Sequence, residues 1–470
     1  MNVSWLTANS TGWLQWRKMR PSVVLILAAL GGNSGIALGA EGEAPIVAAL
    51  TLEQSLRFAE EHNPQLVAAH EKVRSAEAGI VEMRSGLYPH LDASAGVFHL
   101  ESPPTLTLGP LSVPIGREDM RFINVGATQT LYAGGRIQGG IESARLARVD
   151  AKERLRALSR EVAAQVKNAF YGVLFARELV RVRQDALALL QEHLATTQAR
   201  FRQGTAAEFD MLRADVEVAN ARPPLIEVEN QLATAEERFK RALGFDLDSA
   251  VSVNGELRQR PVPFAGAEAA AESAAYACRA EVEAARAAVR LADTQTRIAR
   301  AGDKPTVSLS ANYFGTSPEY FMAPSEDLRW NWMAGVNVTL PLFSGFETRG
   351  RVAKFQAESA GALAQVHDVE QQVRLETRQA FLRIKEAEEL VRSQAQNVVQ
   401  AEKALRIARR RYEQGLGTQL DVTDSRVALT QARVNELSAL YRHELAVAEL
   451  DRAVGCPPGT PTEGREGDEP

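Results

Sequence analysis

Two stretches of the sequence carry one pattern: RFRQGTAAEFDMLRA at residues 200–214 and RYEQGLGTQLDVTDS at residues 411–425. In each, an aromatic residue is followed two positions later by Gln, then by Gly, and six positions after the Gly by Asp. The same shift of 211 residues aligns LYAGG (131–135) with LFSGF (342–346) and RALG (241–244) with RAVG (452–455). A repeat this long indicates a tandem duplication of a half-molecule of about 200 residues, which favours a symmetric assembly over a single catalytic cleft.

The composition excludes several classes of protein. The formal net charge of the 470 residues is −5, and no dense basic cluster is present, so we expect no nucleic-acid binding. Ala, Glu, Gln and Arg abound while aromatic residues are few, which is typical of long helices. The sequence has no phosphate loop, no HExxH and no serine elbow, so we predict no catalytic residues, no metal site and no cofactor.

The N-terminus resembles a secretory signal peptide. Arg17, Lys18 and Arg20 precede an apolar run at 23–30, and small residues follow up to Gly39. We therefore predict a signal peptide at 1–39; the alternative, a membrane anchor, is disfavoured because eight apolar residues span a bilayer poorly. Export would bring the protein to an oxidising compartment, where the two cysteines, Cys278 and Cys456, either pair or remain two separate buried thiols.

Each copy opens with a stretch predicted to be one helix, about 52–85 or 268–301, and its period changes at a proline, Pro89 or Pro305, from helical to alternating. We predict four strands of about ten residues, apolar on one face and rich in Ser, Thr and Asn on the other, at about 90–100, 120–131, 305–314 and 329–341. Trp330 and Trp332 share one strand face, as in an aromatic girdle at a membrane surface, which favours a membrane barrel over a soluble sandwich. Four strands cannot close a barrel, so several chains must share one wall.

Long helices follow the strands. Residues 135–202 and 345–413 contain no proline and carry an apolar seam at a spacing of seven, which indicates coiled-coil helices of about 100 Å. A turn then leads into a return helix, so the predicted hairpins cover about 135–244 and 345–455. We expect Pro223 and Pro224 to kink or break the first return helix. The predicted domains are a first repeat at 50–255, a second repeat at 265–456 and a disordered tail at 457–470.

With its duplication, strand pairs and turn motifs, the chain resembles the TolC-like outer-membrane efflux protein family over about residues 50–456. The resemblance implies a mainly α-helical fold with membrane strands, in which a trimer closes a twelve-stranded barrel in the outer membrane and continues as a helical barrel across the periplasm. It implies a passive exit duct of a tripartite efflux pump. The implied partners are a periplasmic adaptor protein, an inner-membrane RND or ABC pump, and the lipid of the cell outer membrane.

The resemblance also implies a gate at the hairpin turns. Asp421 and Asp424 look like the aspartates that line the family's periplasmic aperture, and Asp210 and Tyr412 look like residues that hold the closed tip together. Crowded carboxylates raise one another's pKa values and attract cations. The alternatives are helix capping for Asp421, helix capping or local hydrogen bonding for Asp210, and core packing for Tyr412 at the end of the heptad seam.

The turn residues themselves are candidates for adaptor contact: Gly204, Thr205, Gly415 and Leu416. Some family members carry a basic latch residue two positions after the second turn glycine, but this chain has Gly417 there. The latch is therefore absent or replaced, for which Arg202 and Arg213 are candidates.

Two other functions stay open. A duct for a dedicated type I protein or peptide secretion system would have the same sequence pattern, because the pump largely selects the cargo. A periplasmic coiled-coil adaptor would also pair long hairpins with β structure, but it would lack two copies of apolar-faced strands.

Overall fold

The protein is represented by a computed structural model that describes residues 49–102, 105–114, 118–262, 264, 267–317 and 328–455. All of these belong to one unit of the chain, residues 46–470. The predicted signal peptide at 1–39, the tail at 457–470 and Cys456 lie outside the described residues. The pairing of Cys278 with Cys456 therefore stays a prediction.

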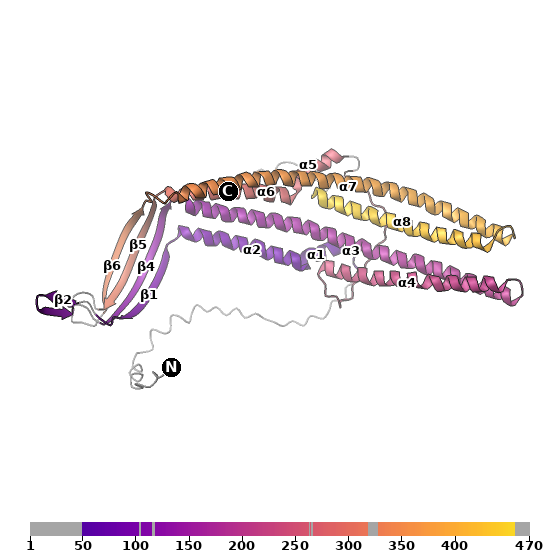
Figure 1. The fold of residues 1–470 in the computed structure, drawn as a ribbon, viewed down its shortest axis with the longest axis horizontal. Coiled ribbons are helices and arrows are strands. Elements are labelled where there is room, and N and C mark those ends of the chain that lie inside the picture. The colour runs from indigo at the N-terminus through magenta and orange to yellow at the C-terminus, as the bar shows by residue number, and fades with distance from the viewer. Residues whose placement is uncertain are drawn as a thin grey trace, which may run out of the picture. The chain divides into compact units, whose positions relative to one another are not determined.

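The order of elements is the same in both halves of the described chain (Figure 1): two short helices, two long strands, a 67-residue helix and a 36-residue return helix. The first half contains α1 (Leu52–His62), α2 (Pro64–Arg84), β1 (His90–His99), β4 (Asp119–Ala133), α3 (Arg136–Arg202) and α4 (Glu208–Leu243). The second half contains α5 (Glu268–Cys278), α6 (Ala280–Ala299), β5 (Thr306–Ser317), β6 (Arg329–Thr339), α7 (Glu347–Glu413) and α8 (Gln419–Val454). Two 3₁₀ turns, η2 (Ser85–Leu87) and η3 (Arg300–Asp303), precede β1 and β5.

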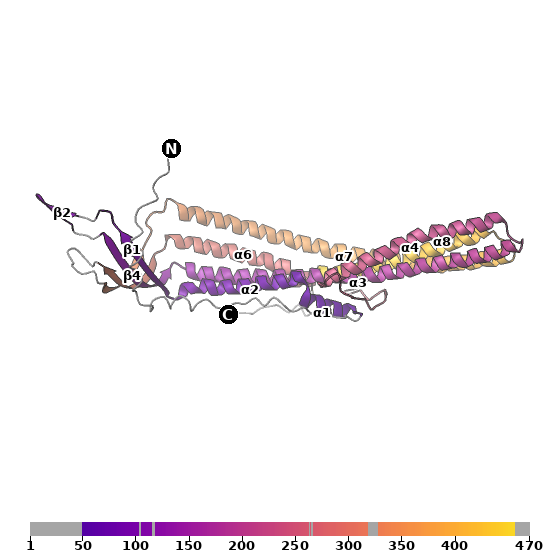
Figure 2. The ribbon, with the colours of Figure 1, turned by 90° about the horizontal axis from the view of Figure 1, so that it is seen from below.

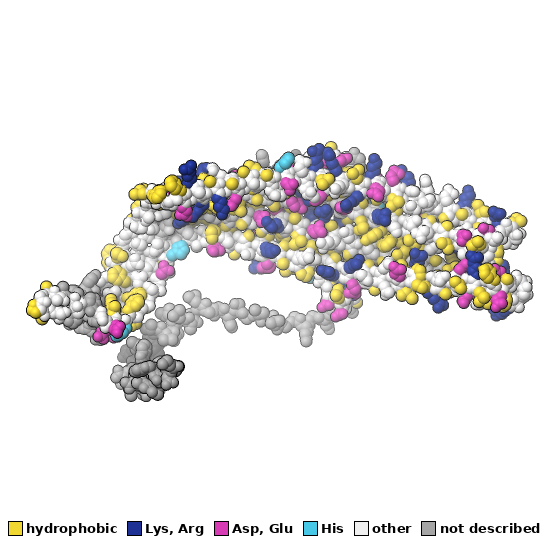
Figure 3. All heavy atoms as spheres, viewed as in Figure 1, with side chains coloured by type: hydrophobic (Ala, Val, Ile, Leu, Met, Phe, Trp, Pro, Cys, Tyr) yellow, Lys and Arg dark blue, Asp and Glu magenta, His cyan; other side chains and the backbone are white. Residues whose placement is uncertain are grey.

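The four long strands form one antiparallel sheet in the order β1-β4-β5-β6. Its register places Val125 opposite Tyr313 and Tyr313 opposite Trp332, so the apolar residues of neighbouring strands share a face, as the alternation predicted. On this face large side chains such as Leu91, Trp332 and Val338 are exposed. Figure 3 shows the sheet from a side on which most side chains are neither hydrophobic nor charged. A sheet with one exposed apolar face and one polar face fits a barrel wall between lipid and water.

The segment between the predicted strands at 90–100 and 120–131 contains a small hairpin that the sequence analysis missed. Strands β2 (Thr105–Leu108) and β3 (Leu111–Pro114) pair with each other, and Gly109 adopts a φ of 62° in the turn between them. The hairpin forms its own two-stranded sheet, separate from the four-stranded one.

The long helices pack as predicted. In Figures 1 and 2, α3 lies beside α2 and α6 toward the strands, and α3 and α7 lie beside their return helices α4 and α8 toward the turns. The heptad seam is buried at Val173 and Val180 in α3 and at Ile384 and Val391 in α7. None of the described helices contains a stretch long and apolar enough to span a bilayer.

The short helices differ from the prediction, which had one helix at the start of each copy. The first is interrupted at Asn63, where φ is −65° and ψ is 123°, and the second at Arg279, where φ is −68° and ψ is 121°. Pro64 explains the first break, because the residue before a proline avoids the helical conformation. No proline follows Arg279, so its conformation depends on tertiary contacts.

The predicted break at Pro223 and Pro224 is wrong: α4 continues through both prolines from Glu208 to Leu243. The two prolines remove two backbone donors from the helix. Val218 and Val228, buried on either side of them, keep the helix packed against its neighbours. Tertiary packing thus outweighs the local helix-breaking preference.

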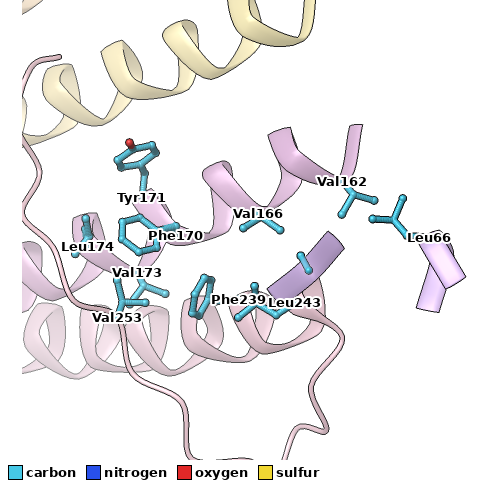
Figure 4. Close-up of a cluster of buried hydrophobic side chains, with 11 residues drawn as sticks. Leu66, Val162, Val166, Phe170, Tyr171, Val173, Leu174, Phe239, Leu243 and Val253 are labelled. Atoms are coloured by element: carbon cyan, nitrogen blue, oxygen red, sulfur yellow. The ribbon is translucent and has the colours of Figure 1, made fainter. Parts of the chain in front are cut away.

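The largest apolar core joins α1, α2, α3 and α4 with the segment that leads to the second repeat (Figure 4). Phe170, Phe239 and Leu243 lie at its centre, and Val253 closes it from the connecting segment. Leu50 forms a parallel bridge with Val253, so the start of the described chain is fixed to the same core.

Candidate functional site

The two hairpin turns lie at the end of the helices away from the strands (Figure 1), and they have the same backbone geometry. Gly204 adopts a φ of 72° and Gly415 a φ of 68°, a conformation that glycine adopts at little cost. The N–H of the next residue returns to a carbonyl of the preceding helix: Thr205 to Arg200 at 2.9 Å, and Leu416 to Arg411 at 2.8 Å. Such bonds satisfy carbonyls left free at a helix end.

The side chains beside the two glycines differ. The Thr205 hydroxyl donates to the carbonyl of Arg200 at 3.0 Å, so it is used within its own turn. The Leu416 side chain is 67% exposed and apolar. Leu416 therefore offers the larger apolar contact surface at the tips.

A polar network around Tyr412 connects the two hairpins. Arg200 of α3 donates from Nη1 to the Tyr412 hydroxyl at 3.3 Å, and this hydroxyl donates to Oε1 of Gln419 at 3.0 Å. The Gln419 amide also contacts the ring of His193 on α3. Helix α3 of the first hairpin is thereby bonded to both helices of the second. The sequence analysis found Tyr412 but missed Arg200, His193 and Gln419.

Asp421 caps its own helix. Its carboxylate accepts from the backbone N–H of Thr418 at 2.9 Å, and its N–H donates to the Thr418 hydroxyl at 3.2 Å, which completes a capping box. The backbone and side-chain bonds with Thr418, and then the charge of Arg411, hold the pKa of Asp421 below its usual range. Within this protomer, the capping alternative therefore describes Asp421 correctly.

Asp424 and Asp210 do not cap helices. Asp424 is exposed one turn beyond Asp421, and within the described residues its carboxylate has no hydrogen bond or ion pair. Asp210 lies in the first turn of α4, whose N-cap, Ala207, makes no side-chain bond, so the capping alternative for Asp210 is wrong.

The proposed substitutes for the latch bind within their own hairpin. Arg213 lies 3.5 Å from Glu217, and Arg202 donates to the carbonyl of Gln198 at 3.4 Å. In this protomer the basic residue that reaches Tyr412 is Arg200. A signal for it was present, because Arg200 aligns with Arg411 in the duplicated motif.

A cavity of about 230 Å³ lies beside the Tyr412 network, between the two hairpins. Its lining includes His193, Arg200, Arg409 and Arg426, together with Glu192 and Glu413. Burial, and then the charge of Arg409, lower the pKa of Arg426. The hairpins are thus joined here by polar contacts around a space rather than by a close-packed apolar core.

The predicted girdle residues lie near the start of β6. Trp330 stacks on Tyr313 with ring centroids 4.9 Å apart, and Trp332 is 77% exposed. A second group of exposed aromatic residues, which the sequence analysis missed, lies at the opposite end of the strands: Tyr88, Tyr132, Phe343 and Phe346. Aromatic residues at both ends of the strands are typical of a membrane barrel.

Across the part of the chain that the structure describes, no group of three or more His, Cys, Asp and Glu side chains could hold a metal ion. Long paired hairpins joined to a four-stranded membrane sheet define the class of outer-membrane channels with a periplasmic helical extension.

The comparisons with known proteins identify the family. The model of the outer membrane efflux protein family matches the chain twice, at residues 56–245 and 272–456, and the chain belongs to this family. The family consists of channel proteins of the outer membrane, whose members form trimers and work with periplasmic adaptors and inner-membrane pumps. The predicted family, fold class, assembly and location are confirmed.

Relatives and solved structures agree with this assignment. Protein CyaE of Bordetella pertussis is 27% identical over 411 residues, which are 85% of this chain and 81% of that protein. The cobalt-zinc-cadmium resistance protein CzcC of Cupriavidus metallidurans is 25% identical and covers 86% of this chain and 90% of its own length. The crystal structure of the outer membrane protein VceC of Vibrio cholerae has a TM-score of 0.71 at 19% identity, covers 86% of this chain and 96% of its own, and shows the same fold.

Proposed function

We propose that this outer membrane efflux channel is a passive exit duct that opens and closes at its hairpin tips. The observation that carries the proposal is the network around Tyr412, because it joins helix α3 of the first hairpin to α7 and α8 of the second. Polar contacts between two packed hairpins can be made or broken without unfolding either of them. The chain itself performs no chemistry, and the energy for transport comes from the pump.

Asp424 is the favoured residue for an acidic constriction, with Asp421 beside it. In a trimer, two aspartates from each of three chains would bring six carboxylates to one aperture. The Asp421 carboxylate is ionised but already bonded to Thr418 and near the charge of Arg411, whereas the exposed carboxylate of Asp424 is available to a cation. Rings of carboxylates favour cations in a pore, so we expect a cation-selective duct that divalent ions block.

The turns at Gly204 and Gly415 are the proposed adaptor contacts, with Thr205 and Leu416 beside them. They lie at the exposed ends of the hairpins, where a periplasmic partner can reach them, and Leu416 supplies exposed apolar surface. Asp210 lies close behind the first turn and, with Tyr412, completes the proposed gate.

The cargo is proposed only as a class. One relative is named for cobalt, zinc and cadmium resistance, and another, of Pseudomonas aeruginosa, for alkaline protease secretion. Export of small solutes or ions through an RND pump and secretion of a protein through an ABC pump both fit the duct. We favour efflux, because an acidic constriction selects small cations directly.

Conductance of the purified trimer in a planar bilayer tests the gate. We expect a small, cation-selective conductance that Mg²⁺ blocks. A divalent ion 4 Å from one carboxylate in water interacts with it by about 2 kcal/mol, so Asp424→Ala should weaken the block by roughly thirtyfold or more. Asp368→Ala removes the same charge far from the turns and should leave the block unchanged. Equal block in the Asp424 variant and the native protein would remove Asp424 from the gate.

A further inference from the structure

A groove lies where strands β4 and β5 meet helices α3 and α6. Its volume is about 700 Å³, and it is lined by both helices, by the turn from β4 to α3 and by the segment that leads from α6 to β5. Four of its side chains are basic and one, Glu142, is acidic, so four positive charges against one negative leave a net charge of +3. The basic residues are Arg145, Arg297, Arg300 and Lys304.

Contacts within the protein position the basic side chains at the groove and use only some of their N–H donors. Lys304 donates from Nζ to the carbonyl of Gly134 at 3.3 Å, and Arg297 donates to the Thr294 hydroxyl at 2.8 Å. Arg145 lies 3.8 Å from Glu142, and both side chains are about half exposed. A guanidinium group carries five N–H donors, so these single contacts leave most of them able to bind an anion.

The start of α3 adds to the positive potential. Its N-cap is Gly135, which has no side chain to cap the helix, and its first turn contains no acidic residue. The free N–H groups of a first turn carry a partial positive charge and favour anions. The equivalent helix of the second copy, α7, has Glu347 in its first turn, and this carboxylate pairs with Arg351. The anion-favouring start is thus a property of the first copy.

The position of the groove indicates where its ligand comes from. On the strand side of it, Leu131 and Tyr132 are exposed at the end of β4. Aromatic side chains at the ends of membrane strands lie at the level of the lipid headgroups. The helices continue from this end of the strands, which makes it the periplasmic end of the barrel. The groove therefore lies at the level of the headgroups of the periplasmic leaflet.

We propose that this groove binds the headgroup phosphate of an anionic phospholipid, whose acyl chains lie against Leu131 and Tyr132. The guanidinium groups of Arg145, Arg297 and Arg300 bind the phosphate oxygens, since their fork of donors matches phosphate geometry. The apolar neighbours favour a lipid over a soluble phosphate. Such a site goes beyond the conduction of cargo, because it fixes the depth of the channel in the membrane at the joint between barrel and helices.

Native mass spectrometry of the purified trimer tests the proposal. It measures the binding of dioleoyl-phosphatidylglycerol and of dioleoyl-phosphatidylcholine to the native protein and to Arg145→Gln/Arg297→Gln/Arg300→Gln. Lys304 is left in place because it bonds to Gly134. The control, Arg154→Gln/Arg181→Gln/Arg392→Gln, removes the same charge from exposed positions on α3 and α7 that do not line the groove. The helical circular dichroism and trimeric mass of each variant are checked first.

The native protein and the control should prefer phosphatidylglycerol to phosphatidylcholine. The groove variant should bind phosphatidylglycerol at least about tenfold more weakly than the native protein does. If the triple variant does not assemble, Arg300→Gln alone should show a smaller loss that Arg300→Lys partly restores. An unchanged preference in the groove variants, or an equal loss in the control, would overturn the proposal.

Inorganic phosphate distinguishes the two sources of a phosphate group. At millimolar concentration it should displace little of the bound phosphatidylglycerol, because it lacks the apolar contacts with Leu131 and Tyr132. Two results would assign the groove to a soluble anion and overturn the lipid proposal. One is full displacement of phosphatidylglycerol by phosphate. The other is binding of phosphate to the lipid-free native trimer that is lost in the Arg145/Arg297/Arg300 variant.

Discussion

The short helices are interrupted at one residue in each copy, Asn63 in the first and Arg279 in the second. The backbone conformation at the two residues is the same, but their side chains differ. Asn63 and Arg279 adopt nearly the same φ and ψ angles, and both reach the end of the return helix in their own copy. The Asn63 amide donates to the carbonyl of Ala242 at 2.9 Å, and the Arg279 guanidinium donates to the carbonyl of Ala453 at 3.3 Å. Ala242 and Ala453 are separated by the same 211 residues as the turn motifs.

In both copies the same backbone carbonyl, that of Ala242 or Ala453, needs a hydrogen-bond donor. The residue that supplies the donor differs between the copies. A buried carbonyl at a helix end costs free energy unless a donor reaches it, and either an amide or a guanidinium can do so. Asn63 also accepts the N–H of Gln65 at 2.9 Å and so caps α2, whereas Arg279 makes no side-chain cap on α6 and instead donates to Glu281 at 3.0 Å and to Glu376 at 2.9 Å. The second copy therefore depends on an ion-pair network where the first depends on neutral hydrogen bonds.

The largest expected effect comes from removing these two side chains. Arg279 is 7% exposed, and its replacement by Ala removes a buried charge that bonds to Glu281, to the carbonyl of Ala453 and to Glu376, of which Glu376 keeps its bond from Gln372. We expect Arg279→Ala to lower the free energy of unfolding by about 3–5 kcal/mol. Asn63→Ala should lower it by about 1–3 kcal/mol. Thermal unfolding of the detergent-solubilised trimer, followed by circular dichroism, measures both. If Asn63→Ala lowered the free energy of unfolding as much as Arg279→Ala or more, the expected difference between the two copies would be wrong.

The two hairpin turns also share a backbone and differ in side chains. Tyr412 bonds to Arg200 and Gln419, whereas its counterpart, Phe201, has no hydroxyl. Tyr412→Phe makes the second tip like the first and should weaken the closed arrangement by about 1–2 kcal/mol in each protomer. The open fraction in single-channel recordings should rise. Phe201→Tyr, the reverse change, should leave it unaltered; a rise of the same size there would assign the effect to tip packing instead.

Much of the fold could be predicted because its determinants are local and occur twice. The alternation in the strands, the apolar seam with Val173 and Ile384, and the glycine at each turn are all visible in the sequence. The break at Asn63 could have been predicted from Pro64. The break at Arg279 could not, since it depends on Glu376 and on a carbonyl 174 residues away.

The same distinction holds at the candidate gate. The residues found from sequence, Tyr412 and Asp421, belong to the repeated motif itself. His193 was missed because its contact with Gln419 joins residues 226 positions apart, and nothing local marks it. The continuity of α4 through Pro223 was missed for a similar reason, since packing by its neighbours overrides the local preference.

A smaller effect is expected from the helix caps that follow the two turns. Thr418 caps α8 with its hydroxyl, whereas the counterpart at the start of α4, Ala207, makes no side-chain bond. Thr418→Ala should lower the free energy of unfolding by about 1 kcal/mol, and Ala207→Thr should raise it by up to a similar amount. Hydrogen exchange of the first turns of α8 and α4 measures each change locally. Unchanged protection of α4 in Ala207→Thr would show that the first turn cannot form a cap.

The smallest effect should be a dependence of the closed tip on pH through His193, whose counterpart in the second copy is Ala404. Burial, and then the charges of Arg426 and Arg200, lower the pKa of His193 below its usual 6.5. The closed tip therefore binds a proton less readily than an open one, so it is most stable above pH 6.5 and weakens as the pH falls below that value. Protonation also removes the acceptor that faces the Gln419 amide.

The open fraction should rise between pH 7.5 and 5.5 by a factor of about 2–5. His193→Gln, which keeps an acceptor but cannot titrate in this range, should abolish the rise. A rise that persists in His193→Gln would assign the pH dependence to other groups of the tip rather than to the contact between the hairpins.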